Sequence, residues 1–373
     1  MTSLVAALLL TQGSPEATLQ VVVGLPELSP SETSTLGLIT RVAPRMTEDY
    51  SQRDILQLTS GRPVVMQLMP DHVRLSISVD GSESLSTVGI AESILRRAVM
   101  RQEDIDSDRG GPIDDWISAI LAPRPASASK RRADVLALYR RVFRAGSLHL
   151  FTGGSADTAR ISEEWNRRLD TWVEPRTRAR ARASEPTTNP RRTAGFSTVT
   201  LVGKTIPARD PALPTRILAL VALGVGKAGS LHRVWREKNG WSYRQEAVLL
   251  PVQAGWQPQL VAAMDPANAA TARDALREDV AAWTERDRDR ALGAAEGAFV
   301  HWTLPSPLYL GSGGTLENNL ADRTYLAGFW RWKTHTPWDP PRLVELMSMI
   351  KLGELKETAL EIVNGSSLRI LPE

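Results

Sequence analysis

The chain has no cysteine among its 373 residues and contains only five histidines. The absence of cysteine excludes disulfides, thiolate metal ligands and cysteine nucleophiles, and it is compatible with any cellular compartment. The histidines are His72, His149, His232, His301 and His335. No two of them have the spacing of a zinc motif such as H-x-x-E-H or H-E-x-x-H. Local spacing therefore predicts no histidine-based zinc site.

The sequence also lacks a long hydrophobic run, and none reaches the roughly 18–20 apolar residues of a membrane span. The apolar N-terminus, Met1–Gln12, has no Lys or Arg before its short apolar core, whereas a secretory signal begins with a basic segment. We favour a buried strand over Leu4–Thr11, a turn over Gly13–Glu16 and a second strand over Ala17–Gly24; a signal peptide is the alternative. The sequence carries no convincing targeting signal, so the cytoplasm is the default expectation.

Charge of one sign is not in excess, because 45 basic side chains are interspersed with 42 acidic ones. The one concentrated basic segment, residues 176–195, contains six arginines among Pro and Thr. We interpret it as a solvated linker. A phosphate-binding tract is the alternative, but no aromatic residue is interleaved to stack on bases. The expected organisation is an N-terminal domain over 1–175, the linker, and a C-terminal domain over 196–373, with no nucleic-acid partner.

Both halves of the chain show the same order of elements, strand, helix, two paired strands and then helices, which indicates an α+β fold made of two similar domains. In the first half we expect strands at Pro63–Met69, Val73–Val79 and Ser147–Thr152, and helices at Glu32–Val42, Arg53–Thr59, Ser84–Arg101, Asp114–Leu121, Lys130–Phe143 and Ala156–Trp172. In the second half we expect strands at Phe196–Gly203, Ser242–Leu250, Pro258–Met264 and Leu368–Leu371, and helices at Pro214–Leu223, Leu231–Lys238, Asn268–Glu285, Asp287–Val300, Pro341–Ile350 and Leu355–Asn364.

The stretch Ser230–Tyr243 has the most informative pattern in the chain. It predicts a helix capped by Ser230, a basic last turn that complements the helix dipole, a stop at Gly240 and a strand that opens with Tyr243. Arg236 and Tyr243, seven residues apart, resemble the Arg and Tyr with which insulinase/pitrilysin-type zinc peptidases bind substrate. Trp241 and Arg244 depart from the residues usual in that family.

A second resemblance to the same family lies in the first half, where Thr47–Ser51 resembles its Thr-x-x-Tyr-Ser run. Alignment on that run places Gly37, Thr40 and Arg41 where the family has its zinc-binding His, its catalytic Glu and its second His. Glycine offers no ligand, threonine is a poor base and arginine repels a cation. No histidine lies between residues 1 and 71, so no small alignment shift restores the motif.

The downstream acids near the family's third zinc ligand, Glu103 and Asp115, would have no site to complete. The resemblance covers essentially the whole chain and implies two homologous domains, each with a mostly antiparallel sheet packed with helices, as in processing-peptidase-type proteins. It further implies a non-catalytic subunit that binds no zinc or other cofactor. Such a chain would supply Arg236 and Tyr243 for binding peptide or unfolded polypeptide while a homologous partner supplies zinc.

Three other functions stay open. The first is a structural or assembly role, as implied by a resemblance to the core subunits of the respiratory cytochrome bc complex. The arginine-rich linker allows a nucleic-acid-binding protein. An independent hydrolase is the third, although no G-x-S-x-G nucleophile elbow is present.

Two glycine-rich segments and a group of tryptophans are the remaining notable features of the sequence. Leu223–Gly229 lacks the order of a phosphate-binding loop, so we expect a close-packed turn. Leu310–Thr315 is either a mobile loop that shapes peptide access or a plain connection. Trp302, Trp330, Trp332 and Trp338, together with Phe329, are expected in a helical core, with a partner-facing surface as the alternative.

Overall fold

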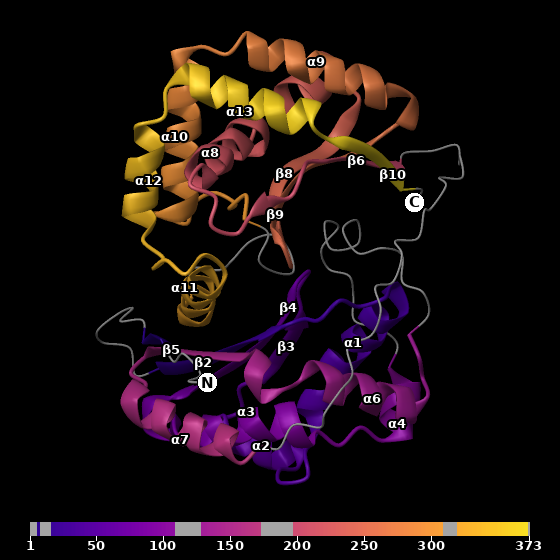
Figure 1. Cartoon of the computed structure of the whole chain (residues 1–373), viewed down its shortest axis with the longest axis vertical. Coiled ribbons are helices and arrows are strands. Elements are labelled where there is room, and N and C mark those ends of the chain that lie inside the picture. The colour runs from indigo at the N-terminus through magenta and orange to yellow at the C-terminus, as the bar shows by residue number, and fades with distance from the viewer. Residues whose placement is uncertain (1–5, 8–15, 109–127, 173–196, 309–318, 372–373) are drawn as a thin grey trace. The chain divides into compact units, whose positions relative to one another are not determined.

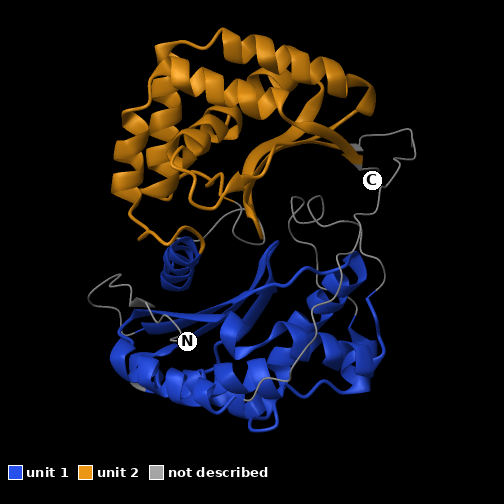
Figure 2. Ribbon diagram, in the orientation of Figure 1, with its two compact units in different colours: residues 1–113, 122–185, 318–332 blue, residues 114–121, 186–317, 333–373 orange. Residues whose placement is uncertain are grey.

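The computed structural model describes residues 6–7, 16–108, 128–172, 197–308 and 319–371. The chain forms two compact units (Figure 2). Unit 1 comprises residues 1–113, 122–185 and 318–332, and unit 2 comprises residues 114–121, 186–317 and 333–373. The expected linker, the helix at Asp114–Leu121, Asp115, most of the N-terminal turn and the glycine-rich segment Leu310–Thr315 lie outside the described residues.

Unit 1 is built on a five-stranded sheet with helices packed against it (Figure 1). Its strands are β1 (Ala6–Ala7), β2 (Glu16–Gly24), β3 (Val65–Leu68), β4 (His72–Asp80) and β5 (Leu148–Gly154), in the order β1-β5-β2-β4-β3. All pairings are antiparallel except β1 with β5. The helices of its N-terminal part are α1 (Pro30–Val42), α2 (Gln52–Leu58), α3 (Ser86–Arg97), α4 (Gln102–Ser107), α6 (Arg132–Val142) and α7 (Thr158–Asp170).

The two faces of this sheet differ because successive side chains of a strand point to opposite sides. In β4, Val73, Leu75, Ile77 and Val79 belong to the hydrophobic core of the unit, which α1, α3, α6 and α7 complete. The intervening positions are polar. Gln20 of β2, for example, donates to Thr18 and Ser76 and accepts from Arg74. One face is therefore a conventional core and the other a buried hydrogen-bonded network.

The polar face of the unit 1 sheet holds a helix that comes from the C-terminal half of the chain. This helix, α11 (Leu320–Thr334), lies beside the sheet in Figure 1 and is coloured with unit 1 as far as Trp332 in Figure 2. His72 joins it to the sheet, with Nδ1 2.7 Å from Asp71 Oδ1 and Nε2 2.6 Å from the hydroxyl of Tyr325. Arg74 adds an ion pair to Asp322 at 2.8 Å. Burial raises the pKa of Tyr325, so its phenol stays protonated.

Unit 2 has a second antiparallel sheet with its helices over one face (Figure 1). Its strands are β6 (Ser197–Val202), β7 (Ile206–Pro207), β8 (Ser242–Val252), β9 (Gly255–Met264) and β10 (Ser367–Leu371). Strand β9 lies between β8 on one side and β6 with β7 on the other, and β10 extends the sheet beyond β6. The helices are α8 (Leu213–Gly224), a π-helix (His232–Lys238), α9 (Ala269–Ala281), α10 (Glu285–Phe299), α12 (Pro340–Ser348) and α13 (Leu352–Asn364).

The α+β class and the two mostly antiparallel sheets confirm the sequence prediction. Three details were wrong or missing. The helix expected over Ser84–Arg101 ends at Arg97, because Ala98 pairs with Thr47 in a β-bridge. Helices α4 and α11 were not expected. Within the described ranges, no helix combines the length and the apolar character needed to cross a bilayer.

Candidate functional site

Helix α1 carries the three positions at which the family resemblance places the zinc motif. Its start is fixed by a capping box, in which the backbone amide of Glu32 donates to Ser29 and the Glu32 carboxylate accepts from the Ser29 amide. Arg141 of α6 forms an ion pair with Glu32 at 2.8 Å. This bond, together with the cap, lowers the pKa of Glu32 to about 2. The helix therefore has a well-fixed N-terminus.

Gly37, Thr40 and Arg41 make contacts within the protein and do not present a ligand set. The hydroxyl of Thr40 is buried and donates to the carbonyl of Gly37 at 2.8 Å. Arg41 forms a two-pronged bond to Asp108, with Nε 3.0 Å from Oδ1 and a terminal nitrogen 2.6 Å from Oδ2. The Asp108 side chain is only 6% exposed.

These residues do not fit zinc, because the zinc-ligand positions on this helix turn hold a glycine and a cation already paired with a carboxylate. Glu103, on α4, is exposed. Across the described part of the chain, no three His, Asp or Glu side chains gather as a metal-binding group.

The Thr47–Ser51 run forms a tight turn between α1 and α2. The Thr47 hydroxyl accepts from the backbone amides of Asp49 and Tyr50, and Ser51 then caps α2 through Asp54. The Tyr50 ring lies on α3, since a Cβ added at Gly89 would come within 2.8 Å of its hydroxyl. The run thus has a structural role here, joining three helices.

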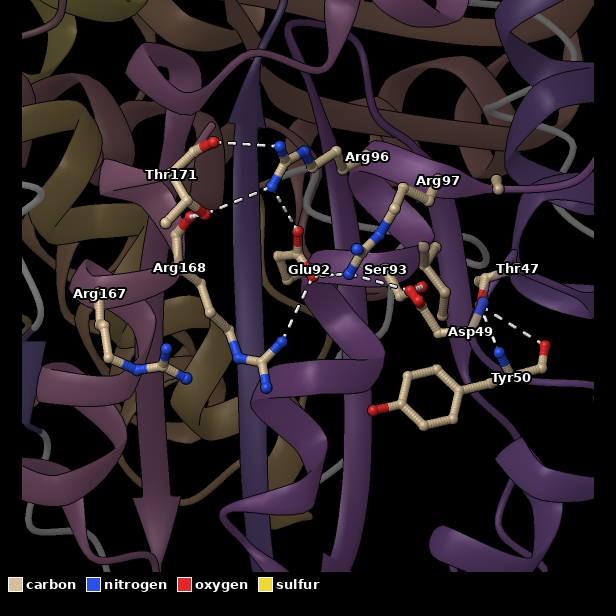
Figure 3. Close-up of polar contacts among 12 residues, drawn as sticks. Thr47, Asp49, Tyr50, Glu92, Ser93, Arg96, Arg97, Arg167, Arg168 and Thr171 are labelled. Atoms are coloured by element: carbon tan, nitrogen blue, oxygen red, sulfur yellow. Dashed lines mark hydrogen bonds and ion pairs between the residues drawn. The ribbon is translucent and has the colours of Figure 1, made fainter. Parts of the chain in front are cut away.

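A buried carboxylate beside this turn was missed by the sequence analysis. Glu92 of α3, with a side chain 2% exposed, contacts Arg96 at 3.2 Å, Arg97 at 2.6 Å and Arg168 at 3.4 Å (Figure 3). Arg168 comes from α7, so the cluster ties two helices together. A carboxylate that already accepts from three guanidinium groups is not free to act as a base or ligand, and the cluster is therefore a structural one.

The second candidate region begins with the π-helix His232–Lys238 of unit 2. Each turn of such a helix is wider than an α-helical turn, and π-helical turns are frequent at functional sites. Its inner face is anchored by Trp235, which is 1% exposed and donates from its indole to the carbonyl of Ala272 on α9. Residues 236–238 consequently face solvent. Ser230 does not act as the expected N-cap; its hydroxyl accepts instead from Trp283 and Arg233.

The end of the π-helix brings Arg236 and Tyr243 together. Gly240 adopts φ +64°, in the left-handed region that glycine favours, and the chain turns directly into β8. A terminal nitrogen of Arg236 donates to the backbone carbonyl of Tyr243 at 3.3 Å, and its guanidinium carbon lies 5.9 Å from the centre of the Tyr243 ring. The prediction that a glycine stop would bring these two side chains together is confirmed.

A β-bulge directs Tyr243 outward. The register of β8 against β9 skips at this residue, since Ser242 pairs with Met264 and Arg244 with the adjacent Ala263. A bulged residue has no partner in the ladder and its side chain can be re-aimed. The Tyr243 side chain is 72% exposed, which makes it the most exposed of the large hydrophobic residues in the described chain.

Arg236 and Tyr243 border an open hollow of about 420 Å³. Its lining is Lys227, His232, Arg236, Glu237, Gly240, Ser242 and Tyr243. Lys227 comes from the turn that follows α8, whose last residue Gly224 packs so closely against Ala247 that an added Cβ would overlap it. This confirms the close-packed turn expected at Leu223–Gly229. The hollow offers hydrogen-bond donors in a setting open to solvent, which suits the binding of carbonyl or carboxylate oxygens.

No protein-family model matches the chain, and no curated protein does. Solved structures do match along its whole length. The peptidase M16 inactive domain from Pseudomonas fluorescens aligns with a TM-score of 0.69 at 13% identity, covering 98% of this chain and 94% of that one. A protease from Helicobacter pylori aligns with a TM-score of 0.75 at 11% identity, over 99% and 97% of the two chains.

A predicted insulinase family protease from Yersinia pestis aligns with a TM-score of 0.59 at 14% identity, covering 96% of this chain and 88% of that one. At such identities the likeness is one of fold. It agrees with the resemblance found in the sequence, which rested on short motifs in both halves. The chain therefore has the fold of the insulinase-type (M16) peptidases.

Proposed function

We propose that the chain is a non-catalytic subunit of a heteromeric insulinase-type zinc peptidase. In this proposal it binds peptide substrate through Arg236 and Tyr243, and a homologous partner chain carries the zinc ion that activates water for hydrolysis. The observation that carries the proposal is the exposed Arg236–Tyr243 pair beside an open hollow. The closed contacts of Gly37, Thr40 and Arg41 support the part of the proposal in which another chain carries the zinc ion.

The two side chains have donors left for a peptide. A guanidinium carries five N–H groups in a fixed fork, and in the described structure Arg236 uses one of its terminal nitrogens to hold the Tyr243 carbonyl. The phenol of Tyr243 projects from the bulge and can donate a hydrogen bond as well. Donors of this kind hold the carbonyl oxygens of an extended peptide. A donor aimed at a developing oxyanion contributes on the order of 10²–10³ in rate.

The test is to isolate the complex from the source cell on a tag at the C-terminus of this chain, and to measure zinc content and peptide hydrolysis. The chain expressed alone is assayed in parallel. We expect zinc and chelator-sensitive cleavage in the complex only. Arg236→Ala should then lower hydrolysis by about 10²-fold or more, and Tyr243→Phe by less. Lys238→Ala, an exposed basic residue on the same helix, is the matched control.

The alternative is a structural or assembly role of the same fold without proteolysis. A complex that holds neither zinc nor peptidase activity would support that role and contradict the proposal. So would an active complex in which Arg236→Ala and Tyr243→Phe cleave as fast as the unmodified chain. Zinc and activity in the isolated chain would show instead that the assignment of Gly37, Thr40 and Arg41 to the motif positions is wrong.

A further inference from the structure

The hollow beside Arg236 and Tyr243 has an excess of positive charge. Three of its lining residues, Lys227, His232 and Arg236, are basic or can become so, and only Glu237 is acidic. Lys227 and Arg236 are both exposed, and neither forms an ion pair with any residue that the structure describes. Glu237 is the one acidic residue of the lining, and a surplus of cationic groups around one hollow favours an anionic ligand.

His232 supplies an independent indication of a ligand. It lines the hollow and its side chain is 10% exposed. Its Nδ1 atom has no hydrogen-bond partner among the described residues, although Glu237 Oε1 lies 3.4 Å away. Buried polar atoms without a hydrogen bond are rare in native proteins. An acceptor bound in the hollow would satisfy this ring.

The chemistry of the lining selects a carboxylate. The hollow of about 420 Å³ is lined by cationic and polar side chains besides Arg236 and Tyr243. A carboxylate has two oxygens, which can accept from an ammonium or guanidinium group on one side and from an imidazole N–H on the other. Glu237, 60% exposed, can swing into solvent when such a ligand enters, because its side chain is mostly in water and its contact with His232 is long, at 3.4 Å.

From these contacts we propose that the hollow is a subsite for a carboxylate of the bound peptide, either an acidic side chain or the C-terminal carboxylate. Lys227 and Arg236 provide the charge, and His232 donates from the base of the hollow. The proposal rests on the proposed function in that it names the class of peptide which the Arg236–Tyr243 site prefers.

The experiment measures binding of four fluorescently labelled peptides of one sequence to the complex and to the full-length chain. The peptides carry a central Glu or Gln, and each has either a free or an amidated C-terminus. We expect the peptide without either carboxylate to bind about tenfold more weakly than the best of the others. Loss on exchanging Glu for Gln identifies a side-chain carboxylate, and loss on amidation identifies the C-terminal one.

A matched pair of variants assigns the effect to the hollow. Lys227→Met should remove most of the preference for the charged peptide, and raising the salt concentration should weaken that preference in the unmodified chain. Lys238→Met changes the net charge equally but lies outside the lining, so it should keep the preference. Thermal unfolding of both variants checks that they are folded.

Equal binding of all four peptides would overturn the subsite and leave the proposed function standing. A preference that survives Lys227→Met, or that Lys238→Met removes as well, would also overturn it. Absence of binding by every peptide, to the complex as well as to the chain, would contradict the proposed function together with the subsite.

Discussion

Helix α1 of unit 1 and the π-helix of unit 2 carry the two halves of one family resemblance, and they differ in how their polar groups are used. On α1, Thr40 bonds to Gly37 and Arg41 to Asp108, so the polar groups there are satisfied within the protein. Beside the π-helix, Lys227 and Arg236 have no carboxylate partner in the described structure and His232 has an unsatisfied nitrogen. The polar groups of the first region are satisfied internally, whereas those of the second lie beside an open hollow.

If this comparison is right, substitutions in the first region should cost stability and those in the second should cost binding. The largest effect in unit 1 is expected outside α1, at Glu92 of α3, where a buried carboxylate with three arginine partners is likewise satisfied within the protein. Glu92→Ala removes the shared partner of Arg96, Arg97 and Arg168 and should destabilise unit 1 by about 2–3 kcal/mol. The loss stays below that of a fully buried pair because the three arginines are partly exposed and can be hydrated. Calorimetric unfolding measures this. Glu103→Ala, at an exposed position, is the control. If both variants lost the same small amount of stability, the cluster around Glu92 would not be important for the fold.

The next effect concerns pH and Glu32, which fixes the start of α1. The bond from Arg141 and the cap lower its pKa from 4.5 to about 2. The folded pKa is lower than the unfolded one, so the stabilisation is complete above about pH 5 and is lost as the pH falls towards 2. Glu32→Gln should therefore be less stable by about 2 kcal/mol at pH 7, below the full value of the pKa shift because water screens this partly exposed pair, with the difference shrinking towards pH 2. Chemical denaturation along a pH series checks this, and a difference independent of pH would contradict it.

A smaller loss of stability is expected when the ion pair between Arg41 and Asp108 is broken. Arg41→Ala leaves the Asp108 carboxylate, 6% exposed, without its two-pronged partner. Because Arg41 itself is one-third exposed and water can partly replace it, we expect destabilisation of about 1–2 kcal/mol. Arg53→Ala, on the exposed side of α2, serves as control. A variant as stable as the control would mean that the pair contributes little.

The smallest effect on stability is expected at the open site. Arg236 and Tyr243 are exposed, so Arg236→Ala and Tyr243→Ala should each change the free energy of unfolding by less than about 0.5 kcal/mol. The same calorimetric measurement applies. A loss as large as that of Arg41→Ala would place these residues among the structural contacts and remove the contrast between the two regions.

The sequence predicted those elements whose residues follow a regular period. Strand β4 alternates in Val73–Val79, and the core face found in the structure is the one this alternation predicts. The helix α11 escaped prediction because its segment is rich in aromatic residues and contains Gly328, which weakens a helical pattern. That glycine is needed because Phe151 of β5 packs against it, and a Cβ there would come within 2.3 Å of the ring.

Within the candidate site, the pairing of Arg236 with Tyr243 was predictable because a glycine stop controls it locally. The π-helical geometry and the bulge at Tyr243 were not predictable from the sequence. Both depend on how this segment packs against the rest of unit 2. His232 and Lys227 join the hollow from separate turns and show no common pattern. Glu92 was missed for a similar reason, because its partner Arg168 is 76 residues away along the chain.

Helix α11 links the folding of unit 1 to the order in which the chain is synthesised. It is synthesised long after β4, yet Tyr325 and Asp322 complete the contacts of His72 and Arg74 in the first sheet. Until α11 is synthesised, the polar face of that sheet lacks these contacts. A fragment that stops before residue 319 lacks this helix altogether, so expressing the N-terminal half alone would give an incomplete unit.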